Sequence, residues 1–177
     1  TYGDLSVNCT STDQGLPIGE TIANVLAYLA LADIPDLNLA YYSSVTGMAN
    51  DQAPSPHYSY SSPLLFDTDP TPCDATYESY HLVGQPFEQA IWELLFNRNC
   101  ATDSCVGTTQ FGNSIWIGSS RDQVILKLGR ALAQSQFILG AAQTYPAIVN
   151  EIKALVLSDS GVSTMNRVDA VFDHHGF

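Results

Sequence analysis

The sequence contains few basic side chains and few charged residues of any kind. Only 6 of its 177 residues are Lys or Arg, against 18 Asp or Glu, so the formal net charge is -12 at pH 7. A surface with this excess of negative charge is repelled by nucleic-acid phosphates and by anionic membranes. The charge balance therefore argues against a nucleic-acid-binding or membrane-surface function.

Long apolar runs and strand signals are also missing. Asp33, Pro35 and Asp36 interrupt the longest apolar stretch, so no run of 18 or more apolar residues can cross a bilayer. Apolar residues nevertheless make up 45% of the chain, which is enough for a core in a chain of this length. We therefore expect a soluble protein whose residues 1–177 form a single domain.

Apolar residues recur at helical spacing in five segments. The predicted helices cover about 19–32, 86–97, 121–137, 145–157 and 164–174. Residues 33–84 show no sustained period and contain six of the nine prolines together with a stretch rich in Tyr and Ser, which is typical of a loop. The sequence therefore predicts a mainly α fold with a long Pro/Tyr/Ser-rich loop at 33–84.

Residues typical of helix ends support these segments. Pro86 is expected in the first turn of the second helix, where its missing N–H costs nothing. Ser residues precede the third and the fifth helix, and Thr144 precedes the fourth, which has Pro146 near its first turn. The fifth helix is expected to end at Gly176, because glycine is common just beyond helix C-termini.

Four cysteines are present, at positions 9, 73, 100 and 105, and their spacing matches neither a zinc knuckle nor a redox motif. Three disulfide pairings are possible, and the short separation of Cys100 and Cys105 favours that pair, which leaves Cys9 for Cys73. Asn8 begins a glycosylation sequon. Together with the low Lys content, these features predict a secreted glycoprotein, and the absence of a signal peptide at the start indicates the processed form.

Glu20 and Asn24 are the first candidate site residues. They are four positions apart, so both project from the same side of the predicted helix 19–32. One interpretation is structural, because an acid in the first turn of a helix is favoured by the helix dipole. The other interpretation is that the pair belongs to a functional site.

The second interpretation follows from a resemblance to fungalysin-type secreted zinc metalloproteases, a branch of the thermolysin-like gluzincins. The segment from Cys9 to Ala27 resembles, without a gap, the family segment that holds Cys, Gly-Glu and an Asp four residues after the Glu. In that family the Glu is the third zinc ligand and the Asp orients a ligating histidine. The resemblance places these two roles at Glu20 and position 24.

Two further segments are similar to the same family. The stretch that starts at Tyr80 resembles the family's His-x-x-Gly-Glu-x-Trp-Ala motif, and His81, Gly84 and Trp92 keep its spacing. In the family this His donates to the oxyanion formed at the scissile carbonyl. Residues 121–177 resemble the helical tail of thermolysin-like proteases. The resemblance therefore implies the fold of the C-terminal lobe of such a protease.

The departures from the family pattern argue against catalysis. Proteolysis in the family needs a His-Glu-x-x-His helix, which supplies two zinc ligands and the general base, and the sequence has no such motif. Asn24 stands where the family has Asp, and Gln85 stands where it has an acid. We therefore expect no catalytic residues and no cofactor, with Glu20, Asn24 and His81 as relics of the ancestral site.

The other titratable groups are also expected to be structural. The four histidines are His57, His81, His174 and His175. They are too dispersed to supply the converging ligands of a zinc site. We expect His81 to make structural hydrogen bonds and the adjacent pair at 174 and 175 to cap the last helix at its negative end. Asp67 and Asp69 are expected to be solvated turn residues.

These features predict a non-catalytic, secreted accessory subunit that binds and stabilises a larger secreted enzyme. A protease lobe without its other half exposes an apolar face, which favours a partner, and the Tyr/Pro-rich segment 40–63 is a candidate contact. Free-standing proteins of this kind resemble the small subunits of heterodimeric fungal laccases, so a multicopper oxidase is the specific candidate partner. The alternative is one chain of a two-chain zinc metalloprotease, in which Glu20 ligates zinc and His81 stabilises the oxyanion. No residue supports an isolated inhibitor or a lectin-like binder.

Overall fold

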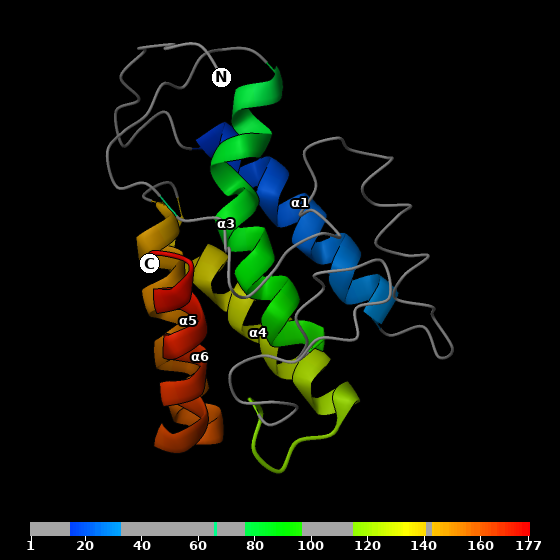
Figure 1. Ribbon diagram of the computed structural model, residues 1–177, viewed down its shortest axis with the longest axis vertical. Coiled ribbons are helices and arrows are strands. Elements are labelled where there is room, and N and C mark those ends of the chain that lie inside the picture. The colour runs from blue at the N-terminus through cyan, green and yellow to red at the C-terminus, as the bar shows by residue number, and fades with distance from the viewer. Residues whose placement is uncertain (1–14, 33–65, 67–76, 97–114, 141–142) are drawn as a thin grey trace.

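The computed structural model describes residues 15–32, 66, 77–96, 115–140 and 143–177 (Figure 1). Its helices are α1 (Gly15–Ala32), α3 (Tyr77–Phe96), α4 (Arg121–Leu139), α5 (Tyr145–Ser160) and α6 (Val162–His174). No strand occurs within these ranges, so the prediction of a mainly α protein is confirmed. The predictions for the four cysteines, Asn8, His57, Asp67 and Asp69 fall outside the described residues, as does the segment 40–63.

Helix α3 is the central element. It contacts α1, α4 and α6, while α5 and α6 lie side by side as a pair and α4 also packs against α5 (Figure 1). Every side chain of α3 from Pro86 to Leu95 is buried. A helix that is buried on all sides is the centre of a domain core rather than a surface element.

The predicted start of the second helix was wrong. Helix α3 begins at Tyr77, so the loop predicted for 33–84 includes the first part of a helix, and Pro86 lies inside α3 rather than in its first turn. A proline in a helix interior removes one backbone hydrogen bond and costs roughly 3 kcal/mol. The burial of α3 among three other helices outweighs this local cost, and that burial is not visible in the local sequence.

The other four helices contain the predicted segments and extend each of them at one end. Ser120 caps α4 through a capping box, in which its N–H donates to Gln123 Oε1 (2.8 Å) and its Oγ accepts from the Gln123 N–H (3.4 Å). Thr144 Oγ1 accepts the Ala147 N–H at the start of α5 (3.2 Å). The predicted Ser and Thr caps of these two helices are therefore confirmed.

The serine cap predicted for the last helix was wrong. Gly161 is the residue before α6, and no side chain caps the helix there. Gly161 alone separates α5 from α6 and has a φ of 80°, which places it in the left-handed region. A residue without a Cβ atom is favoured at such a position, so the tight turn between the two helices selects glycine rather than a serine.

The core is apolar and rich in aromatic rings. Phe87 of α3, Tyr145 of α5 and Phe172 of α6 are buried together, and the rings of Phe66 and Phe177 pack against them. The Phe66 N–H donates to the His175 carbonyl oxygen (2.7 Å), which fixes Phe66 to the residues after α6. These contacts join α3, α5 and α6 into one packed unit.

Candidate functional site

The two candidate residues on α1 have different surroundings. Glu20 is exposed to solvent, whereas Asn24 is half-buried and its Nδ2 donates to Oε1 of Glu88 on α3 (2.9 Å). His81 lies within α3, but its side chain is outside the described part of the structure. The described contacts thus join Asn24 to a residue that the sequence prediction missed, and they leave Glu20 facing solvent.

Glu88 explains why position 24 carries an amide. Its side chain is only 1% exposed, and a buried carboxyl group needs hydrogen-bond donors to offset its lost hydration. Asn24 supplies such a donor, while an ionised aspartate offers only acceptors. The sequence signal for this contact is Glu88 itself, an acidic residue among the apolar residues of a predicted helix. In the structure this part of the helix is buried.

A second hydrogen bond links the same part of α1 to α5. The hydroxyl groups of Thr21 and Tyr145 are 2.8 Å apart, and both side chains are buried. Burial raises the pKa of the Tyr145 phenol above its usual range, against the lowering effect of the Thr21 bond, and the charge of Glu88 raises it further. Tyr145 is therefore held in its neutral form in the folded protein.

Gly84 on α3 makes this contact between helices possible. A methyl group at this position would overlap Thr21 Oγ1 and would lie 3.0 Å from the Tyr145 hydroxyl. The glycine that resembles a protease motif residue in the sequence thus has a packing role. We call Thr21, Asn24, Gly84, Glu88 and Tyr145 the α1–α3 polar cluster.

The described contacts of this cluster are structural. Its two described hydrogen bonds connect groups within the protein, and its residues line neither of the two described cavities. Within the described ranges, no group of three or more His, Cys, Asp or Glu side chains could hold a metal ion. The cluster holds α1 against α3 and α5 through paired polar groups.

A buried acid, Glu93, lies near the C-terminal end of α3, close to a buried histidine, His175, that directly follows α6. Glu93 Oε2 is 3.6 Å from His175 Nε2, and both side chains are fully buried. His174 lies in the last turn of α6 and His175 is its C-cap residue, as predicted for this pair. The cap is made by the His175 N–H, which donates to the Phe172 carbonyl oxygen (2.9 Å). The packing of α6 along α3 turns the His175 imidazole into the core, so it does not lie in solvent at the helix end.

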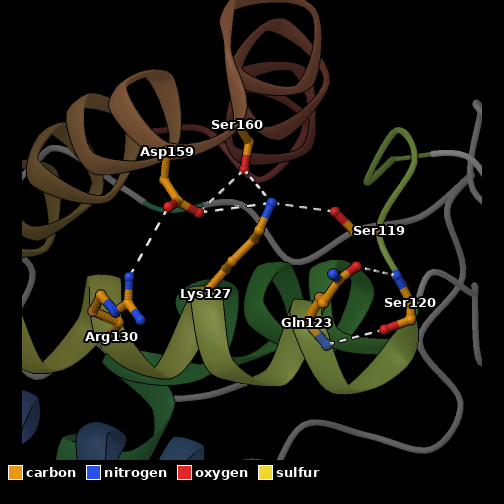
Figure 2. Close-up of polar contacts among 7 residues, drawn as sticks. All are labelled: Ser119, Ser120, Gln123, Lys127, Arg130, Asp159 and Ser160. Carbon is orange, nitrogen blue, oxygen red and sulfur yellow. Dashed lines mark hydrogen bonds and ion pairs between the residues drawn. The ribbon is translucent and has the colours of Figure 1, made fainter.

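Lys127 forms the main polar contact between α4 and the end of α5. Its Nζ donates to Ser119 Oγ (3.3 Å) and Ser160 Oγ (2.9 Å) and lies 3.6 Å from Asp159 Oδ2 (Figure 2). Arg130 Nη1 is 4.0 Å from the other oxygen of Asp159. A cavity of about 270 Å³ lies beside these residues and is bordered by Lys127. The donors of Lys127 are already engaged by Ser119, Ser160 and Asp159. These polar contacts hold α4 against the end of α5.

Helices α1 and α4 present an apolar surface to solvent. Leu126 and Phe137 on α4 are 67% and 90% exposed, and Leu26 on α1 is about half exposed. A groove of about 630 Å³ lies between the two helices, and we call it the α1–α4 groove. It is lined by Leu29, Ala30, Asp122, Ile125, Leu126, Gly129 and Arg130. Large apolar side chains that are exposed close together are found at binding faces.

None of the described helices has both the length and the apolar character that crossing a bilayer requires. No protein-family model matches the sequence, and no curated protein or solved structure is significantly similar to it.

Proposed function

We propose that this chain is a non-catalytic, secreted accessory subunit that binds and stabilises a larger secreted enzyme. The resemblance to small subunits of heterodimeric laccases makes a multicopper oxidase the specific candidate partner. The chain then descends from a fungalysin-like C-terminal lobe that has lost its zinc chemistry. It needs no cofactor of its own.

The contact between Asn24 and Glu88 carries the non-catalytic part of this proposal. The resembling proteases use an aspartate at this position to orient a zinc-ligating histidine. Here the side chain at 24 donates to a buried carboxyl group on α3, 2.9 Å away. A carboxylate at 24 would meet a second carboxylate at this distance, and like charges that close do not both ionise without a large penalty. The surroundings of position 24 therefore favour an amide and disfavour the metal-orienting acid.

The exposed apolar side chains of α1 and α4 support the binding part. The side chains of Leu126 and Phe137 are large, apolar and exposed, so their transfer from water into an apolar contact is favourable. A partner that covers them binds the folded state and not the unfolded state, and it therefore stabilises the chain by mass action. This is the behaviour expected of an accessory subunit.

Native mass spectrometry of the protein purified from its source, combined with metal analysis, tests the proposal. The expected result is a complex with one larger secreted chain, without stoichiometric zinc. Copper bound by the larger chain would identify a multicopper oxidase. Stoichiometric zinc together with a partner chain that carries a His-Glu-x-x-His helix would contradict the proposal.

The second candidate, a two-chain zinc metalloprotease, rests on the exposure of Glu20. This carboxylate faces solvent, so a partner chain with two histidines could use it as the third ligand. Glu20→Gln separates the two candidates. It should leave the stability of the complex unchanged if the chain is an accessory subunit. It should abolish zinc binding and peptidase activity if the chain is half of a protease. Asp173→Asn, another exposed acid, is the matched control.

A further inference from the structure

An ionisable pair in the core joins α3 to the residue that follows α6. His175 Nε2 lies 3.6 Å from Glu93 Oε2, and both side chains are fully buried. This separation is within the range of an ion pair between a protonated imidazole and a carboxylate. A glutamate is almost never fully buried unless it is paired. The proposed function gives this pair no role.

The position of Phe66 depends on His175. The His175 carbonyl oxygen accepts the Phe66 N–H (2.7 Å), and the Phe66 ring stacks on that of Phe177 with centroids 4.6 Å apart. Gly176 has a φ of 84°, and a Cβ atom there would lie 3.0 Å from the Phe66 carbonyl oxygen. Movement of the His175 side chain out of the core would therefore disturb the contacts between Phe66 and residues 175–177.

Other titratable groups near the pair come from α6 and α5. On α6, the ring of His174 lies beside the imidazole of the pair, with ring centroids 5.6 Å apart. On α5, Lys153 Nζ pairs with two acids of α6, Asp169 and Asp173. The ring of Tyr145 packs edge-on against Phe66, and its phenol is neutral in the folded protein. Within the described contacts, the acid that faces the imidazole is the buried one on α3.

The net charge of the pair is set by the number of titratable protons that it holds. With one such proton, the pair is either an imidazolium beside a carboxylate or an imidazole beside a carboxyl group, and its net charge is zero. A second proton makes the pair positive, and loss of the proton makes it negative. A net charge in a buried site costs far more free energy than in water. Burial therefore favours the singly protonated pair.

We propose that Glu93 and His175 form a proton-controlled latch, which holds Phe66 and residues 175–177 in the core while the pair carries one titratable proton. When the latch opens, both groups reach water, where glutamate titrates near pH ~4.3 and histidine near pH ~6.5. Above about pH 6.5 the open form loses the proton that the closed form keeps, so opening becomes easier as the pH rises. Below about pH 4.3 the open form takes up a second proton, so opening becomes easier as the pH falls. The latch is tightest between these two values, in weakly acidic solution.

A double-mutant cycle in the full chain tests the pair. Glu93→Gln, His175→Gln and the double variant keep polar side chains of similar size that do not titrate. The coupling between the two positions, measured by urea unfolding from about pH 3.5 to 8, should be largest near pH ~5.5 and shrink on both sides. The matched control is the cycle of Glu93→Gln with His174→Gln, which should show no maximum of comparable size. A coupling between Glu93 and His175 that does not change with pH would overturn the latch.

Hydrogen exchange in the unaltered chain gives a second measurement, which decides the matter if a variant fails to fold. The opening constant of the Phe66 amide, corrected for the intrinsic dependence of exchange on pH, should rise by up to about tenfold per pH unit between about pH 7 and 8. Few groups other than histidines titrate in this range. His174→Gln should keep the rise. A Phe66 opening constant that stays level would overturn the latch. Both measurements use this chain alone, so their outcome is independent of the proposed function.

Discussion

At the scale of single residues, the side-chain amide of Asn24 supplies a donor that an aspartate cannot. We expect Asn24→Asp to lower the free energy of unfolding by about 2 kcal/mol or more at neutral pH, because it removes the donor and places a second negative charge beside buried Glu88. Asn24→Ala removes only the donor and should cost about 1 to 2 kcal/mol. Urea denaturation of the three proteins measures this order. Equal stability of Asn24→Asp and wild type would show that Glu88 does not need the amide.

The buried phenol of Tyr145 predicts a loss of stability at alkaline pH. The pKa of this group is raised in the folded state, while an unfolded tyrosine ionises near pH 10. Above about pH 10 the unfolded state therefore binds fewer protons than the folded state, so stability falls as the pH rises toward the folded-state pKa. Below about pH 10 this contribution is fully present.

Tyr145→Phe should cost about 1 kcal/mol at pH 7 through the lost bond to Thr21. The difference in unfolding free energy between wild type and Tyr145→Phe should shrink above about pH 10, because only the wild type carries the titrating group. Denaturant unfolding at a series of pH values from 8 to about 11 measures the difference. A constant difference across that range would contradict the assignment of this titration to Tyr145.

At the scale of helices, the sequence predicted the elements whose signals are local. The helix starts marked by Ser120 and Thr144 were predicted because a cap acts within three residues of its partner. The start of α3 was not predicted, because Pro86 locally disfavours a helix interior and the opposing burial comes from other helices. The pairs Asn24 with Glu88 and Glu93 with His175 could not be predicted either, since each joins residues far apart in the sequence.

Two helix glycines should respond in opposite directions to the same substitution. Gly84→Ala places a methyl group onto Thr21 Oγ1, so we expect a net loss of about 1 to 3 kcal/mol despite the gain in helix propensity. Gly129→Ala meets only an ordinary contact and should raise the free energy of unfolding by up to about 1 kcal/mol. Chemical denaturation of both variants gives the two signs. A gain at Gly84 would mean that α1 and α3 do not approach as closely as described.

At the scale of the whole molecule, the net charge and the apolar surface have complementary effects. The charge of -12 opposes contact between copies of the chain. Leu126 and Phe137 remain exposed on α4 and favour contact with a different protein. Under the proposed function, the net charge limits association between copies of the chain, and the exposed apolar side chains remain available to a partner. The stability of the chain should therefore depend on the concentration of that partner.

Binding of the large chain should raise the stability of this chain by mass action. At a free partner concentration of 100 times Kd, the expected gain in unfolding free energy is about 2.7 kcal/mol. Because the proposed partner covers exposed apolar side chains of α4 and α1, protection from hydrogen exchange should increase first at backbone amides of these two helices. Hydrogen exchange with mass spectrometry, with and without the large chain, measures both effects. Leu126→Gln should reduce the added protection at equal partner concentration, whereas Leu157→Gln on α5 should keep it. Added protection centred on α6, with α1 and α4 unchanged, would place the interface away from the exposed apolar side chains of α1 and α4.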